Sequence, residues 1–325
     1  MHSKLRPLLL FSSILSSSYS YSIEIDSPPS KDTSYTPLYA GSLLAFFSEN
    51  AAPGQWEIEP YLYQTTLPGI YDQNWSFQKE KSTHELSVSL LLETGITSYL
   101  DVTLFMGSTY SQMGNQHTFL YQDTQVYLGF QVLHDTKNSW IPDLRFLVGE
   151  NFPTGKYQHL IPEKQLSDNS GSGAYETSFF FVVAKTFYCS PKHPFNINFN
   201  FEYILPCKTN VKGYNLYGGG SDTRGTISPG KEYMLNLAIE YSLTQNWVIG
   251  TDIHYVHQNK STFSGNPGVI NPFIGLPSSD QISLAPCLQY NFNANFGLFI
   301  ASWFTVAGRN SDKFINNTLS AYWVF

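Results

Sequence analysis

The sequence predicts an all-β fold, specifically a transmembrane up-and-down antiparallel β-barrel of about 12 strands. The first indication is composition: 24 Phe, 22 Tyr and 6 Trp make the 325-residue chain 16% aromatic, and only 13% of its residues are charged, about half the usual share. No apolar run approaches the ~20 residues that a membrane-spanning helix needs. The net charge of −7 comes without a basic block, so we expect no nucleic-acid partner.

The N-terminus predicts export. Lys4 and Arg6 precede an apolar stretch of eight residues, 8–15, and the small residues that follow fit a cleavage site near Ser20 or Ser22. Eight apolar residues are too few to anchor the chain in a bilayer. We therefore expect residues 1–20 to be a cleaved signal peptide.

The segment before the first expected strand, residues 21–53, has no clear period. Its first part resembles a linker, whereas residues 38–47 (LYAGSLLAFF) are apolar. Two placements remain open, a plug inside the lumen and a periplasmic segment at the mouth of the barrel. The barrel itself is expected over residues 54–325.

Alternation with period two is the second indication. In residues 195–203 (FNINFNFEY) every odd position is apolar and every even position is polar, and residues 84–93 and 232–243 alternate in the same way. A strand points successive side chains to opposite faces, so each segment has one apolar and one polar face. A helix would mix the two sets because its faces recur every 3.6 residues.

Segment and connection lengths are the third indication. Twelve strands are expected, most of 11 to 14 residues, whereas strands of soluble proteins are shorter and a tilted membrane strand needs about 9–11. Longer and shorter connections alternate along the chain, as outer loops and periplasmic turns do in outer-membrane barrels. A soluble β-sandwich has no reason to sort its loops by length. The expected strands are 54–65, 84–95, 100–110, 122–133, 141–151, 176–189, 195–205, 231–243, 247–257, 281–292, 296–306 and 313–325.

The polar face of these strands is expected to line the lumen, because a charged side chain facing lipid costs about 2–4 kcal/mol near the bilayer midplane. Acids outnumber bases on this face. The charges either pair within a solvated interior or select permeants, and Arg145 either cross-links the wall or narrows a pore. The expected lumen-lining residues are Glu57, Glu59, Glu85, Glu93, Asp101, Arg145, Glu202, Glu240, Asp252 and His254.

Aromatic residues near the ends of the strands are expected to form the two interfacial girdles. They are Trp56, Tyr63, Tyr99, Tyr110, Trp140, Tyr188, Tyr241, Trp247, Tyr255, Trp303 and Trp323. The last strand places Leu319, Ala321, Trp323 and the terminal Phe325 on one face, which resembles the carboxy-terminal assembly signal of bacterial outer-membrane proteins. We therefore expect partners in outer-membrane lipid and in the barrel-assembly machinery.

The sequence offers no catalytic constellation. No His is followed two residues later by Ser, and the nearest string, His134-Asp135-Thr136, falls in an expected short turn. Cys189, Cys207 and Cys287 show no metal-binding spacing, so they form one disulfide or none. We expect no enzyme activity, no cofactor and no metal.

Three blocks resemble one known family. Residues 144–157 (LRFLVGENFPTGKY), 171–187 (GSGAYETSFFFVVAKTF) and 233–255 are similar to the strand–Pro-Thr-Gly hallmark, the following glycine block and the late hairpin of the outer-membrane family named for the meta-pathway of phenol degradation. The resemblance covers about residues 84–325 and implies an outer-membrane transporter, often of small hydrophobic compounds.

The predicted function is passage of a small solute across the outer membrane of a Gram-negative bacterium. The acid-rich lumen suits aromatic hydrocarbons poorly. The alternative is a structural or surface-interaction barrel whose long loops contact other molecules, for which an intermolecular disulfide through Cys207 would be evidence.

Overall fold

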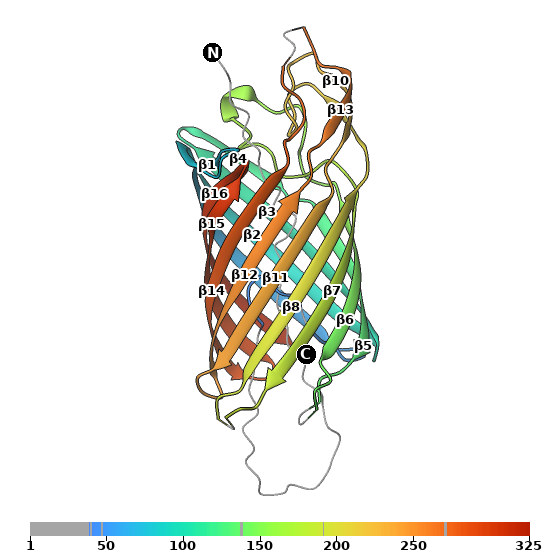
Figure 1. The fold of residues 1–325 in the computed structure, drawn as a ribbon, viewed down its shortest axis with the longest axis vertical. Helices are drawn as coiled ribbons and strands as arrows, with labels where there is room; N and C mark the ends of the chain where they lie inside the picture. Colours follow the sequence, from blue (N-terminus) through green and yellow to red (C-terminus); the bar gives the residue numbers. More distant parts are fainter. Residues whose placement is uncertain (1–38, 40, 47, 137–138, 191, 270–271) are drawn as a thin grey trace, which may run out of the picture.

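The computed structural model describes residues 39, 41–46, 48–136, 139–190, 192–269 and 272–325. The strands occupy twelve antiparallel positions around a closed barrel, which confirms the predicted fold class (Figure 1). Each of these twelve positions is called a stave below. Eleven staves are single strands: β1 Trp56–Tyr71, β2 Phe77–Thr97, β3 Leu100–Met113, β6 Asp143–Phe152, β7 Glu176–Phe187, β8 Phe195–Pro206, β11 Glu232–Ser242, β12 Trp247–Gln258, β14 Ser279–Asn293, β15 Phe296–Arg309 and β16 Ser311–Val324. The twelfth consists of β4 Gln116–Tyr121 and β5 Thr124–Leu133, which both pair with β3.

The barrel closes between its first and last strands. Strand β1 pairs with β16, with Leu62 opposite Leu319, and on its other side with β2. Every other stave pairs with its chain neighbour. An even number of staves leaves both ends of the barrel sequence at the rim with the short turns, the periplasmic rim by the usual rule.

Two of the segments predicted as long connections between strands are mostly strand, so the prediction was wrong for them. Residues 66–83 form mainly strand, because β1 continues to Tyr71 and β2 starts at Phe77, with the turn between them held by Asp72, whose carboxylate accepts the backbone N–H groups of Asn74 and Ser76. Residues 111–121 likewise contain the end of β3 and all of β4. Polar and apolar residues no longer alternate there, because these parts of the strands extend beyond the membrane and neither of their faces contacts lipid. The backbone pairing between the strands nevertheless continues.

The three longest connections, 153–175, 207–231 and 259–278, lie at the opposite rim and form an ordered cap. Within them β9 Thr209–Lys212, β10 Arg224–Ser228 and β13 Thr262–Asn266 make a small sheet in the order β13-β10-β9, which rises beyond the barrel in Figure 1. A separate apolar cluster supports this sheet; its members are Val211, Leu216, Tyr217, Ile227 and Leu276.

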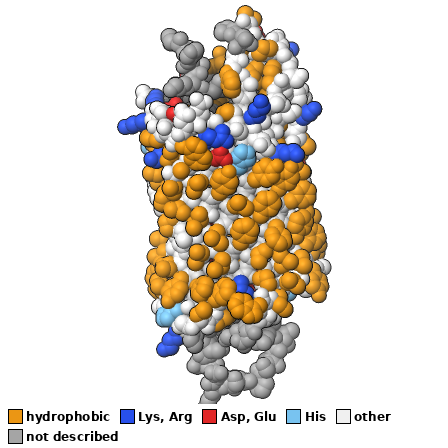
Figure 2. All heavy atoms as spheres, in the orientation of Figure 1, with side chains coloured by type: hydrophobic (Ala, Val, Ile, Leu, Met, Phe, Trp, Pro, Cys, Tyr) orange, Lys and Arg blue, Asp and Glu red, His pale blue; other side chains and the backbone are white. Residues whose placement is uncertain are grey.

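The outer wall carries a broad apolar belt (Figure 2). On β2, Leu86 and Val88 are 48% and 53% exposed, whereas Ser87 and Ser89 between and beside them are buried. This alternation is the one that a barrel in lipid requires, with apolar side chains outside and small or polar ones inside. Within the described residues, no helix is long and apolar enough to cross a membrane.

Candidate functional site: the barrel lumen

The predicted lumen-lining side chains lie on the buried side of the wall. Nine of them are between 0 and 4% exposed, and Glu85, in the extracellular half of β2, is half-buried. They belong to β1, β2, β3, β6, β8, β11 and β12, so they are distributed around the barrel and do not converge on one point. Their roles in permeation stay a prediction.

Arg145 lies on β6 at the centre of a charged cluster. Its Nη2 is 2.5 Å from Asp101 Oδ2 and 3.6 Å from Glu93 Oε1, and all three side chains are at most 2% exposed. Arg145 Nη1 also donates to the backbone carbonyl of Glu49 at 3.2 Å, and Asp101 Oδ2 accepts the backbone N–H of Ala51 at 3.2 Å. The cluster therefore joins three strands to the chain that precedes β1.

That preceding chain lies inside the barrel. Ser42, Leu43, Leu44, Ala45 and Phe46 are between 0 and 3% exposed. Their surroundings are inward-facing side chains of strands far away in sequence, so the described part of residues 41–52 is called the luminal segment below. Its place in the barrel depends on contacts that the sequence alone does not reveal.

Asp252 on β12 holds the first part of the luminal segment. Its Oδ1 accepts from Ser42 Oγ at 2.7 Å and from Asn236 Nδ2 at 2.7 Å. Its Oδ2 accepts the backbone N–H groups of Leu43 and Leu44 at 3.1 and 3.4 Å. One carboxylate thus satisfies two backbone donors that the dry interior would otherwise leave unpaired.

Wall amides hold the rest of the luminal segment. Asn200 and Asn198 on β8 bind the backbone N–H and carbonyl of Phe46 at 2.5 and 2.8 Å. Gln289 on β14 donates to the Gly41 carbonyl at 2.5 Å, and Gln131 on β5 accepts the backbone N–H of Asn50 at 3.0 Å. Sequence reasoning missed these amides because it selected only charged residues, although they share the inward parity of the acids.

Aromatic rings fill the lumen around the luminal segment. The ring of Phe46 lies 5.0 Å from that of Tyr127 and 4.6 Å from that of Phe180 in edge-on contacts. Leu43 and Leu44 belong to the same apolar cluster, which also includes Tyr61, Tyr63, Phe105, Trp303 and Phe314 on the wall. The interior is therefore mixed, with apolar packing between charged and amide groups.

The prediction of an interfacial girdle position was wrong for two residues. Tyr63 and Trp303 are 1% and 3% exposed and point inward, where Trp303 Nε1 donates to Ser283 Oγ at 2.8 Å. Tyr63 has the same parity along β1 as Glu57 and Glu59, so the alternation itself contained the correct assignment. Both rings belong to the apolar cluster that surrounds Leu43, Leu44 and Phe46 of the luminal segment.

His254 is the least satisfied of the predicted residues. Its side chain is 1% exposed, and neither ring nitrogen has a hydrogen-bond partner among the described residues. Its ring meets the edge of Trp303 with centroids 6.3 Å apart. Glu240, by contrast, accepts from Gln289 Nε2 at 2.8 Å, and Glu59 accepts from Ser320 Oγ at 3.0 Å.

The Pro153-Thr154-Gly155 motif starts the extracellular cap. Its Gly155 N–H donates to Asp123 Oδ1 at 2.8 Å, and the N–H of Ser172 donates to Asp123 Oδ2 at 2.8 Å. A Cβ at Gly155 would come within 2.5 Å of the Ser170 carbonyl oxygen, so only glycine permits this close approach. Asp123 therefore joins the two sequence blocks that carry the family resemblance.

A buried tyrosine ties the cap to these blocks. Tyr217 donates its hydroxyl to the Ser172 carbonyl at 2.8 Å. Burial, with the nearby carboxylates of Glu176 and Asp123, raises the pKa of Tyr217 well above its ordinary value. The phenol therefore stays a neutral hydrogen-bond donor across the physiological pH range.

The closed ring of strands, the lipid-facing belt and the polar, aromatic lumen define an outer-membrane β-barrel. The family model described as "Putative MetA-pathway of phenol degradation" matches residues 65–321, and the chain belongs to this family. The luminal segment lies before the matched region. The resemblance noted in the sequence is thereby confirmed.

The COG4313 channel structure shows the same fold. The crystal structure of the COG4313 outer membrane channel from Pseudomonas putida F1 aligns with a TM-score of 0.64 at 14% identity, covering 86% of this chain and 98% of that one. A mutant of TodX, a monoaromatic hydrocarbon channel, aligns with a TM-score of 0.43 at 12% identity, over 84% of this chain and 91% of that one. No curated protein matches the sequence.

Proposed function

We propose that this barrel passes small solutes across the outer membrane of a Gram-negative bacterium, and that the luminal segment closes the path in the state described here. The observation that carries the proposal is the filling of the lumen. The interior is occupied by residues 41–46 and 48–52 of the chain, held by wall carboxylates and amides. Such a segment can leave without breaking any strand pairing.

The wall indicates what an opened lumen would favour. Among the ten predicted lining residues Arg145 is the only Lys or Arg, and it is paired with Asp101. Seven acids other than Asp101 remain on the list, so the opened lumen would have a negative potential that concentrates cations. The aromatic rings around Phe46 offer apolar contact to the same solute.

Export and assembly belong to the same proposal. Cleavage near Ser20 or Ser22 would release the chain into the periplasm. The outward side chains of Leu319, Trp323 and Phe325, which are 49%, 43% and 67% exposed, are then available to the assembly machinery and afterwards to lipid.

Single-channel recording in a planar bilayer tests the proposal. The full chain is expected to conduct in small or rare steps, and a variant lacking residues 39–52 in large, stable ones, under a salt gradient that reports ion selectivity. Circular dichroism and heat-modifiable migration on gels verify that both form barrels. A folded deletion variant that conducts no better than the full chain would contradict solute passage through this lumen.

A second function is favoured by exposed aromatic side chains at the extracellular rim. Phe119, Tyr121 and Phe273 are 61%, 72% and 60% exposed, at the rim that would face the cell's surroundings. Aromatic side chains in such positions suit contact with another macromolecule. Cys207 is also exposed there, so a dimer band on non-reducing gels that disappears with reductant would favour this surface role.

A further inference from the structure

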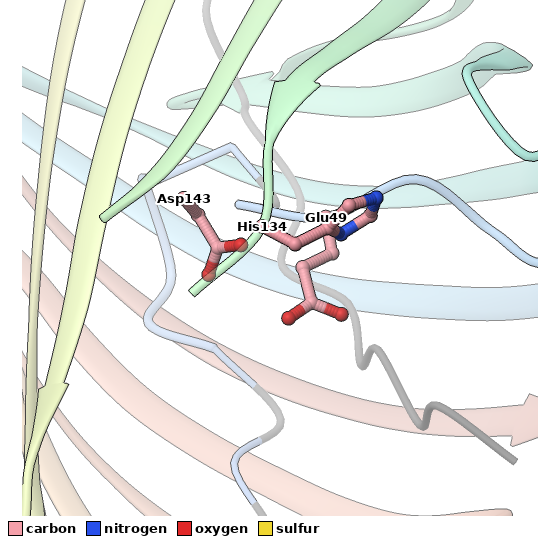
Figure 3. A group of neighbouring side chains, drawn as sticks. All are labelled: Glu49, His134 and Asp143. Atoms are coloured by element: carbon pink, nitrogen blue, oxygen red, sulfur yellow. The ribbon is translucent and has the colours of Figure 1, made fainter. Parts of the chain in front are cut away.

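Three potential metal ligands converge at the periplasmic mouth of the barrel. Glu49 belongs to the luminal segment, His134 directly follows β5, and Asp143 is the first residue of β6. Each offers one ligand atom, and the three atoms lie within 4.8 Å of one another. Figure 3 shows the three side chains gathered where the luminal segment passes the lower ends of β5 and β6.

The donor set suits a divalent transition-metal ion. An imidazole nitrogen and two carboxylate oxygens are common ligands of Zn²⁺, at about 2.0–2.2 Å from the ion. Tetrahedral ligands at that distance lie about 3.3 Å apart, so the three atoms need only move closer by side-chain rotation. Asp143 is 4% exposed, so its side chain is held in place by the wall. His134 is exposed and Glu49 is half-buried, so both of these side chains can rotate toward the ion.

Neighbouring charges favour a cation at this place. Asp135 lies next to the cluster, and its backbone N–H donates to Asp143 Oδ1 at 2.7 Å. The ammonium group of Lys185 is bound to the Asp135 carboxylate, and the guanidinium of Arg145 to Asp101. The carboxylates of Glu49 and Asp143 carry like charges and repel each other at this separation. A divalent ion bound between them would offset this repulsion.

We propose that Glu49, His134 and Asp143 form a zinc-class metal site that fastens the luminal segment to the barrel wall. Water fills the fourth coordination position on the exposed side of His134. The ion links a residue of the luminal segment to two residues of the wall, next to the hydrogen bond from Asn50 to Gln131. Metal concentration in the periplasm would thereby set how firmly this part of the segment is held. The sequence predicts no metal site, and it does not reveal this one because the three ligands lie up to 94 residues apart and show no motif.

Zinc binding to the refolded full-length chain in detergent is the first measurement. Isothermal titration should show one Zn²⁺ per chain, and Co²⁺ should give the visible absorption bands of a four-coordinate site. Protons compete with the metal for imidazole and carboxylate, so the affinity should fall as the pH is lowered from 7.5 to 5.5.

Variants assign the ligands. His134→Asn and Glu49→Gln should each weaken binding by about tenfold or more. His193→Asn is the matched control, because His193 is another imidazole at the periplasmic end that lies in the β7–β8 turn, with Nδ1 3.1 Å from the Ser242 carbonyl oxygen. If Asp143→Asn fails to fold, the other two variants still decide. Zinc affinity that is the same in wild type, His134→Asn and Glu49→Gln would overturn the site.

Hydrogen–deuterium exchange tests the fastening itself. Zinc should slow exchange of the backbone amides of residues 48–52 several-fold in the wild type and leave those of His134→Asn unchanged. The turn at 294–295 is the internal reference, since it lies away from the cluster. Zinc binding without any slowing at 48–52 would overturn the fastening role. Neither measurement depends on solute transport, so the metal site and the proposed function can fail separately.

Discussion

At the residue scale, a few inward-facing side chains hold the luminal segment to the barrel wall. Arg145 satisfies Asp101 and approaches Glu93 in a fully buried cluster. Asp252 accepts three donors from the luminal segment and one from Asn236. Buried charges persist only when they are paired and hydrogen-bonded, so these residues are expected to be sensitive to substitution.

Arg145→Gln is expected to destabilise the barrel by about 3–5 kcal/mol, because it leaves buried carboxylates without their counter-charge. Urea unfolding in detergent, followed by tryptophan fluorescence, measures the change. The double variant Arg145→Gln/Asp101→Asn should recover part of the loss, because it removes one of the stranded charges. Lys192→Gln in an exposed turn is the control, and an Arg145→Gln midpoint equal to that of this control would contradict the pairing argument.

Asp252→Asn keeps the shape of the side chain but replaces one acceptor oxygen by a donor group. Either Ser42 or the Leu43 and Leu44 amides then lose their acceptor, at a cost of about 1–3 kcal/mol. Backbone amides of residues 42–46 should exchange with deuterium roughly tenfold faster or more, by the same free energy. Exchange that remains at the wild-type rate would show that apolar packing alone holds the segment.

At the element scale, strands and loops follow different rules on the two sides of the membrane. Strands β1 to β4 extend beyond the lipid belt as paired ribbons, where alternation no longer marks them. The remaining extracellular connections are held by specific contacts such as those of Asp123 with Gly155 and Ser172. The barrel and its cap therefore depend on different interactions.

Asp123→Ala should loosen the cap and leave the barrel intact. The substitution removes the acceptor for the backbone N–H groups of Gly155 and Ser172, so residues 153–175 should become cleavable by trypsin at Lys156 or Lys164. Asp222→Ala, another acid in the cap, which accepts from the Val269 N–H, is the control. Equal cleavage of both variants would contradict a special role for Asp123.

The last strand carries a prediction about assembly. Phe325→Ala should lower the yield of folded barrel in the outer membrane several-fold while leaving stability after folding nearly unchanged, because the terminal residue is 67% exposed. Heat-modifiable migration of the membrane fraction measures the yield. Phe292→Ala, which removes another outward aromatic of 49% exposure, is the matched control, and an equal yield from the two variants would remove the case for a C-terminal signal.

At the scale of the whole molecule, the barrel combines an apolar exterior with an acidic, aromatic interior that the chain itself fills. Under the proposed function, the closed ring of twelve staves supplies the passage, and the luminal segment would determine whether the passage is open. Solute selection then depends on wall residues that the segment covers or leaves accessible. Those residues are tested best once the segment has been removed.

In the variant that lacks residues 39–52, Glu202→Gln and Glu240→Gln are each expected to reduce cation selectivity. Water enters the opened lumen and leaves both carboxylates ionised. Each substitution removes one negative charge from this confined path, so the reversal potential under a salt gradient should move toward zero. Glu163→Gln in the extracellular cap leaves the lumen unchanged and is the control. Reversal potentials that match that control would show that these acids do not face the conducting path.

Much of this architecture was predictable because lipid imposes it on the sequence. Twelve strand positions, the inward direction of the acids and the closure of the barrel follow from alternation and loop length, since a strand between lipid and lumen must alternate. The same parity would have placed Tyr63 inside and identified Asn200 and Gln289 as lining residues. The errors there came from treating aromatic rings as lipid-facing and from considering only charged groups.

The tertiary structure alone decided what fills the barrel and what gathers at its mouth. Residues 41–46 have no period, so nothing in their sequence distinguishes a place in the lumen from one outside it. Their placement depends on Asp252, Asn200 and Gln289, which lie between 154 and 248 residues away in the chain. The meeting of Glu49, His134 and Asp143 depends in turn on that placement. Lipid constrains each strand locally, whereas the interior is determined by contacts between residues that only the closed barrel brings together.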